Sequence, residues 1–187
     1  MAWLREAGVG VIVLSYWKGE TPPSTVDLVF DTAEHYGIQV AFHIEPYAGR
    51  TADEMAETVH GLLERYADSP ALYRLDAESL YLDGVRARPL VFVWATNFAS
   101  QTDQSERPVE YWASGVDAIH AVDDAFVVAC PCGGRYAESV LGGHFDGAYN
   151  YASLFLDQED FTWAQTLPAG SLYIPSVMPG SAQNAIG

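Results

Sequence analysis

Short apolar runs alternate along the chain with longer amphipathic stretches. Several of the runs are rich in Val, Ile and Phe with little alternation, which is typical of parallel strands covered on both faces. Six runs have this character: Val9–Tyr16, Ile38–Ile44, Pro89–Ala95, Ala125–Cys130, Phe145–Tyr151 and Ser171–Val177. They predict six strands, within which we expect these residues to be buried: Val11, Val13, Val40, Phe42, Val91 and Val127.

Apolar residues at helical spacing mark several of the intervening stretches. A helix is predicted between a Ser24 or Thr25 cap and Gly37, which suits a left-handed C-terminal cap. Thr51 opens a capping box ahead of a second helix. Pro108 suits the first turn of a third helix.

Repeated strand–helix units predict an α/β fold with right-handed crossovers. The alternatives are an open doubly wound sheet and a (β/α)₈ barrel. A barrel has eight strands and typically about 250 residues, whereas this chain of 187 residues supplies about six strand–helix units. Missing units at both ends would reconcile the two counts. Residues 1–187 are then a single, partial (β/α) barrel domain.

The chain is strongly acidic, with nine Lys and Arg against 25 Asp and Glu and a formal net charge of −16. Such a charge repels nucleic acid and anionic membranes, so a neutral or cationic partner is expected. Lys18 is the single lysine, which disfavours a phosphate site. The sequence has no apolar run long enough to span a membrane. Met1–Gly8 is typical of the end of a helix rather than a leader peptide, which predicts that Met1 is an internal methionine of a longer protein.

Two cysteines, Cys130 and Cys132, flank a single proline. A bridge across so short a span is strained, and no His or Cys cluster nearby completes a zinc site. We therefore interpret them as ordinary thiols and expect no metal.

Two residues with polar, ionisable side chains, His43 and Glu45, lie at the end of the second apolar run. Side chains alternate along a strand, so these two residues share one face, and Pro46 then stops the ladder. A His and a Glu are expensive to bury without partners. This favours a functional site over the alternative, a satisfied structural His–Glu pair.

Ligands bind at the carboxyl ends of parallel strands, and here those ends are aromatic, hydroxylic and carboxylic. Such a mixture suits a sugar, whose C–H faces lie on aromatic rings while its hydroxyls need fixed partners. The candidate binding residues are Trp17, His43, Glu45, Tyr47, Arg50, Tyr149 and Tyr151. Structural alternatives stay open: Trp17 can plug the core, Arg50 can pair with Glu54, and Asp146 can serve as a turn residue.

Four strand-end segments carry a resemblance: Gly8–Trp17, His43–Thr51, Phe145–Tyr151 and Ile174–Gly180. In order and spacing they resemble motifs of family 99 glycoside hydrolases, the endo-α-1,2-mannosidases and endo-mannanases. The resemblance implies a (β/α)₈ barrel that cleaves α-mannosides internally with retention and needs no metal or cofactor. It also implies a location in the secretory pathway or outside the cytoplasm, and a mannose-containing oligosaccharide or glycan as partner.

By the same resemblance, His43 and Glu45 bind mannose hydroxyls near the cleaved bond. Trp17 forms part of the sugar platform, with Tyr149 or Tyr151 nearby.

One departure from the family concerns catalysis. The family's catalytic carboxylates are similar to a Glu-Trp-His-Glu segment on a later strand, and this sequence contains no Trp-His pair. We therefore expect an internal fragment or a divergent member that carries the sugar-binding face without the acid/base pair and is inactive alone. No catalytic residue is assigned. The alternatives are a non-catalytic glycan-binding barrel and a family 99-like domain attached to surface-polysaccharide synthesis enzymes.

Overall fold

The computed structural model describes residues 1–75, 87–131, 136–151 and 166–175. Its main feature is a seven-stranded sheet in which six strands follow the order β1-β2-β4-β7-β8-β9 and β3 pairs with β4. The strands of this sheet are β1 (Val11–Tyr16), β2 (Gln39–Ile44), β3 (Arg74–Leu75), β4 (Arg88–Trp94), β7 (Phe126–Cys130), β8 (Gly147–Tyr149) and β9 (Leu172–Ile174). A separate hairpin pairs β5 (Phe98–Ser100) with β6 (Asp103–Glu106).

The six strands along this path are all parallel to their neighbours, and each new strand adds to the same side of the sheet. A doubly wound sheet reverses its strand order at a switch point, and no reversal occurs among the described strands. The sheet is therefore singly wound, as in a barrel, with β1 and β9 at the edges of its described part. The expected α/β class and partial barrel are confirmed.

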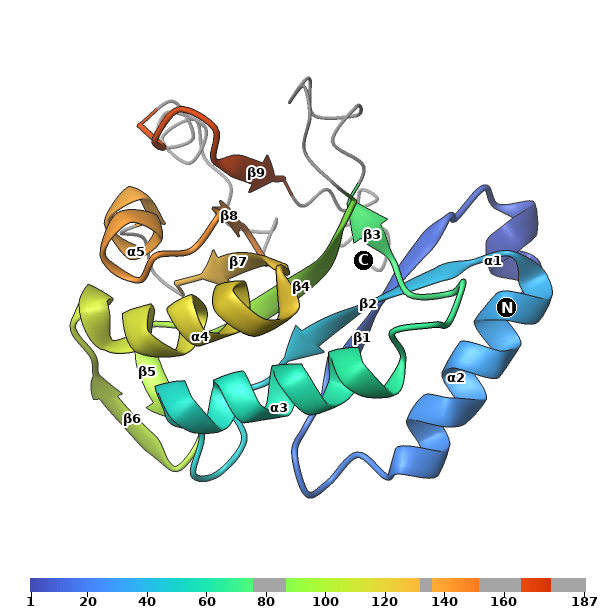
Figure 1. Cartoon of the computed structure of the whole chain (residues 1–187), viewed down its shortest axis with the longest axis horizontal. Coiled ribbons are helices and arrows are strands. Elements are labelled where there is room, and N and C mark those ends of the chain that lie inside the picture. Colours follow the sequence, from blue (N-terminus) through green and yellow to red (C-terminus); the bar gives the residue numbers. More distant parts are fainter. Residues whose placement is uncertain (76–86, 132–135, 152–165, 176–187) are drawn as a thin grey trace, which may run out of the picture.

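The helices lie outside the curved row of strands, as Figure 1 shows for α2, α3, α4 and α5. Their bounds are α1 (Ala2–Glu6), α2 (Pro23–Tyr36), α3 (Ala52–Arg65), α4 (Ala113–Asp123), which follows the 3₁₀ helix η2 (Val109–Trp112), and α5 (Tyr136–Gly142). Among the described helices, none is long and apolar enough to cross a membrane.

The expected helix ends are confirmed where local chemistry fixes them. Gly37 closes α2 in the left-handed conformation, with φ of 63°, a backbone that glycine adopts without steric cost. The Thr51 hydroxyl caps α3 by accepting the backbone N–H of Glu54 at 3.2 Å. At the start of α2, however, Pro22 stands at the cap position in place of Ser24 or Thr25, and no side-chain cap bond forms.

Alternation along the strands creates two different layers. Phe42 and Ile44 on β2 face the helices and join the larger apolar core. Ala41 faces the opposite side and joins a smaller cluster with Phe92 and Tyr149. His43 lies on this inner face with Ala41, so the strand period places polar chemistry inside the curve of the sheet.

Four of the six residues expected to be buried are at most 1% exposed: Val40, Phe42, Val91 and Val127. The prediction is wrong for Val13, which is 48% exposed, and Val11 is only half-buried. Both residues lie on β1, at the edge of the described sheet, and Val13 borders a cavity on the inner face. An edge strand beside a cavity has too few neighbours to cover its apolar side chains.

A glycine allows α4 to approach α3 closely. A Cβ atom on Gly115 would lie 2.3 Å from the carbonyl oxygen of Ala52, so any side chain there forces the two backbones apart. Gly61, on the exposed side of α3, has no atom within 4 Å of the same position.

These two glycines predict opposite responses to alanine. Gly115→Ala should lower the free energy of unfolding by about 2 kcal/mol, because the added methyl overpacks a backbone contact. Gly61→Ala should raise it by about 0.5–1 kcal/mol, because alanine restricts the unfolded chain and favours the helix. Urea denaturation of the full-length gene product, followed by circular dichroism, measures both changes. Two changes of the same sign would contradict the close contact.

Candidate functional site

His43 and Glu45 form a buried pair at the carboxyl end of β2. The His43 Nδ1 and Glu45 Oε1 atoms lie 2.8 Å apart, and the two residues are 4% and 5% exposed. The backbone N–H of Glu45 donates to the Tyr16 carbonyl at 3.1 Å, so the pairing with β1 extends one residue past the strand. The predicted shared face is therefore confirmed.

Tyr149 of β8 completes a line of three hydrogen-bonded side chains. Its phenolic oxygen lies 2.7 Å from His43 Nε2 although the two residues are 106 positions apart. The strands β4 and β7 separate β2 from β8 in the sheet, and three strand spacings amount to about 14 Å in a flat sheet. The contact therefore depends on the curvature that turns both side chains toward the same interior.

A cavity of about 350 Å³ opens beside this line. It is lined by Val13, Ser15, His43, Phe92, Tyr149, Tyr151 and Ile174. The register of the sheet explains the grouping, because Ser15 pairs with His43 and His43 pairs with Phe92. Sequence reasoning left Ser15, Phe92 and Ile174 out of the site, although counting back from each strand end in steps of two would have found them.

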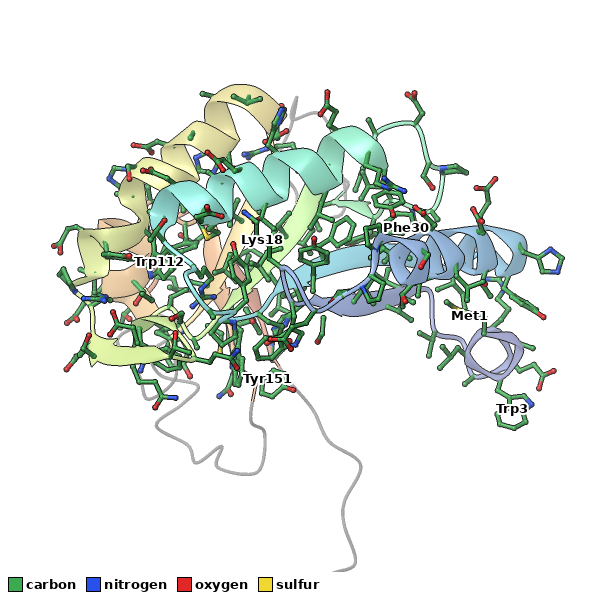
Figure 2. All side chains as sticks on the ribbon, turned by 90° about the horizontal axis from the view of Figure 1, so that it is seen from below. Met1, Trp3, Lys18, Phe30, Trp112 and Tyr151 are labelled. Carbon is green, nitrogen blue, oxygen red and sulfur yellow. The ribbon has the colours of Figure 1, made fainter. Side chains whose placement is uncertain are left out.

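Aromatic rings form one wall of the site. Tyr151 stacks on His43 with ring centroids 5.9 Å apart and an interplanar angle of 29°, and its centroid lies 5.2 Å from that of Trp94. Tyr151 is 60% exposed, and Figure 2 shows it on the side of the sheet away from α3. The indole Nε1 of Trp94 is buried with no hydrogen-bond partner among the described residues. The exposed Tyr151 ring is therefore the aromatic face that this wall presents to the cavity.

Three predicted binding residues, Tyr47, Arg50 and Trp17, lie away from the cavity. Tyr47 is 2% exposed, and its hydroxyl lies 2.9 Å from Thr58 Oγ1 and donates to the Glu54 carbonyl at 3.1 Å. Burial raises the pKa of the Tyr47 phenol. This residue packs the start of α3 against the sheet and does not border the cavity.

Arg50 is 1% exposed and is likewise absent from the cavity. Its guanidinium donates to five backbone carbonyls, which belong to Ile44, Trp94, Ala95, Phe98 and Ala99, at 2.7 to 3.5 Å. Its Cζ atom also lies 4.8 Å from the ring centroid of Trp112. Burial lowers the pKa of Arg50 to about 10, which leaves it protonated at neutral pH. The side chain holds the ends of β2 and β4 in place through these carbonyl contacts.

Trp17 is half-buried and packs against the core beneath the helices, while its backbone N–H donates to Thr21 Oγ1 at 3.0 Å. It follows Tyr16, whose side chain also faces the helices, and it does not border the described cavity. The neighbouring Lys18 forms an ion pair with Glu54 at the start of α3. Figure 2 shows Lys18 close to that helix.

A comparison with known protein families identifies the family of this chain. A sequence model of glycosyl hydrolase family 99 matches residues 1–187, the whole chain. The chain belongs to glycosyl hydrolase family 99.

Family 99 relatives match it over its full length. It is 25% identical to the glycoprotein endo-alpha-1,2-mannosidase of Mus musculus and 28% identical to the glycoprotein endo-alpha-1,2-mannosidase-like protein of Homo sapiens. The alignments include 100% of this chain and 42% of each relative, so the chain spans less than half of their length.

A solved family 99 structure has the same fold. This is the endo-alpha-mannosidase from Bacteroides thetaiotaomicron in complex with bis-tris-propane, with a TM-score of 0.73 and 23% sequence identity. The match covers 96% of this chain and 54% of that chain.

Asp146, for which the sequence allowed a turn role, forms contacts within the fold. One of its carboxylate oxygens lies 2.8 Å from His120 Nε2 and accepts the backbone N–H of Val127 at 2.7 Å. Asp146 precedes β8, so it lies at the opposite end of the strand from Tyr149. Cys130 is buried at the end of β7, and Cys132 lies outside the described residues. No group of three or more His, Cys, Asp or Glu side chains among the described residues is placed to hold a metal ion.

The carbonyl contacts of Arg50 predict a large loss of stability on substitution. Arg50→Met should lower the free energy of unfolding by at least about 3 kcal/mol, because it leaves several buried carbonyls without donors. Urea denaturation of the full-length gene product measures the loss.

Arg65→Met is the matched control for Arg50→Met. Arg65 pairs with Asp27 on the surface, where such an ion pair contributes about 1 kcal/mol or less. Equal losses for the two variants would contradict the structural role of Arg50.

Proposed function

We propose that this chain forms the sugar-binding wall of a retaining glycoside hydrolase of the endo-α-mannosidase type. Its ligand is an α-mannoside, with an α-1,2-linked mannose unit lying in the cavity beside His43, Tyr149 and Tyr151. The observation that carries the proposal is the buried line from Glu45 through His43 to Tyr149 at the edge of this cavity.

The lining of the cavity supports a sugar ligand. A volume of about 350 Å³ lies within the range of small-molecule sites, which is about 300–1,000 Å³. The Tyr151 and Phe92 rings line the cavity and offer apolar faces for sugar C–H groups, and the Ser15 and Tyr149 hydroxyls line it as polar groups. A phosphate or nucleotide would lack cationic partners here, because no Lys or Arg lines the described cavity.

The names of the relatives support the choice of sugar. The mouse protein that matches the whole chain is a glycoprotein endo-alpha-1,2-mannosidase, and the bacterial structure with the same fold is an endo-alpha-mannosidase. We propose the same substrate class for this chain.

Hydrolysis requires catalytic groups that are not among the described residues lining the cavity. Glycosidases generally use two carboxyl groups beside the scissile bond, yet no Asp or Glu is among the described residues that line the cavity. We therefore assign sugar binding to this part of the protein and the acid and base to residues outside it. The same observation favours the second candidate function, a glycan-binding barrel without hydrolytic activity.

His43 provides the direct test of sugar binding. His43→Ala removes a lining residue and the partner of Tyr149, so α-1,2-mannobiose should bind at least about tenfold more weakly, since one lost hydrogen bond to a charged or polar partner is worth about 1–3 kcal/mol. Isothermal titration calorimetry of the full-length gene product measures the affinity. His35→Ala, on the exposed face of α2, is the matched control and should bind as the wild type does.

Unchanged affinity in His43→Ala would remove this cavity as the sugar site. Release of reducing ends from an α-1,2-linked mannan by the same preparation separates the two candidate functions. The hydrolase gives new reducing ends, whereas the glycan-binding barrel gives none.

A further inference from the structure

A second cavity lies on the helix side of the sheet, between α2 and α3, and we refer to it as the outer groove. Its volume is about 370 Å³, and it shares no lining residue with the inner cavity. Ser15 lines the inner cavity and the next residue, Tyr16, lines the outer groove, so the two spaces lie on opposite faces of β1. The sugar site proposed above makes no use of the outer groove.

One face of α3 forms the long wall of the outer groove. Glu57, Gly61 and Arg65 line it at intervals of four residues, which places them in one row on the helix. Eight residues of α-helix span about 12 Å, so the cavity is elongated along α3. Its base is apolar, because Val26 of α2 and Leu62 of α3 line it and are 1% and 7% exposed.

Gly61 keeps the middle of this row open. A Cβ atom on Gly61 would meet no atom within 4 Å, whereas one on Gly115 would collide with the Ala52 carbonyl. Figure 1 shows α4 on one side of α3 and α2 on the other, so close helix packing explains the glycine of α4 but not the glycine of α3. A glycine inside a helix weakens that helix. At Gly61 its effect is to leave room for a ligand against the helix backbone.

The charges of the outer groove favour a neutral ligand. Lys18 and Arg65 line it, but Lys18 pairs with Glu54, and Arg65 pairs with Asp27 through Nε and Nη2. An anionic ligand would compete with these two carboxylates, and a cationic ligand would meet the two cations. Glu57 also lines the groove and forms no hydrogen bond or ion pair with the residues that the structure describes. A sugar hydroxyl, which both donates and accepts, suits this mixture of groups.

We propose that the outer groove is a second carbohydrate-binding site, in which a neutral sugar lies along α3. Its hydroxyls contact the Glu57 carboxylate and the remaining N–H donors of Lys18, and its C–H groups lie on the Val26 and Leu62 side chains. The ligand class rests on the proposed mannoside function, and the site adds a second sugar unit outside the sheet. A glycan polymer that occupies both sites binds more tightly than one unit does, through effective concentration.

Methyl groups report on the two sites separately. In the full-length gene product with ¹³C-labelled Ile, Leu and Val methyls, α-1,2-mannobiose should shift the signals of Val26 and Leu62 in the outer groove. It should also shift those of Val13 and Ile174 in the inner cavity. Gly61→Phe places a ring in the open groove, so it should abolish the ligand response of the first pair and leave that of the second pair unchanged.

A second variant tests the polar contact. Glu57→Ala should weaken the binding of α-1,2-mannobiose at the outer groove at least about tenfold, the value of one hydrogen bond to a charged group. Glu64 is exposed on α3 and does not line the groove, so Glu64→Phe and Glu64→Ala are the matched controls and should respond as the wild type does. Thermal unfolding confirms that each variant is folded.

The spectra separate the failure of this inference from that of the proposed function. Shifts at Val13 and Ile174 alone would overturn the outer site and leave the proposed function standing. Shifts at Val26 and Leu62 alone would support the outer site and remove the inner cavity as the sugar site. A groove response that persists in Gly61→Phe would also overturn the inference, because the ligand then lies elsewhere.

Discussion

The buried guanidinium of Arg50 is the interaction on which the rest of the site depends. It donates hydrogen bonds to backbone carbonyls at the end of β2 and in the turn after β4, and Trp112 packs over it. Trp112 in turn donates its indole N–H to the Thr96 carbonyl at 2.7 Å. One charged side chain thus fixes both strand ends that carry His43 and Trp94. Charge-assisted bonds are stronger than neutral ones, so a single cation can organise a turn in which Ala95 has a positive φ of 52°.

Curvature of the sheet brings side chains from these strand ends together on its inner face. The parallel register places Ser15, His43 and Phe92 in one row on the inner face, and the helices cover the other face. Because the sheet bends, Tyr149 reaches His43 across two intervening strands. The interior is therefore polar at the carboxyl ends of β2 and β8 and apolar below, where Ala41 and Val128 pack.

Sequence reasoning located the principal strands and helices because their signals are local and redundant. The β2 run, the Gly37 cap and the Thr51 cap each depend on short-range chemistry, and the structure reproduces them. The short strands β3, β5 and β6 were not predicted, because two to four residues of mixed polarity carry no periodic signal.

The candidate site was predictable only where a strand fixes direction. His43 and Glu45 follow the two-residue period, and so does Tyr149, whereas Tyr47 and Arg50 come after Pro46 and turn toward α3 and the β4 turn. No pattern in the sequence shows that the Arg50 guanidinium donates hydrogen bonds to backbone carbonyls about 50 residues later in the chain. That information lies in the packing of distant segments.

The central claim is that the inner face of this sheet, at the carboxyl ends of its strands, binds a mannoside. A crystal structure of the full-length gene product with α-1,2-mannobiose tests it most directly. A mannose ring is expected in the cavity against Tyr151, with one hydroxyl in hydrogen-bond contact with the Tyr149 oxygen. Disaccharide bound elsewhere on the protein, with this cavity filled only by water, would contradict it.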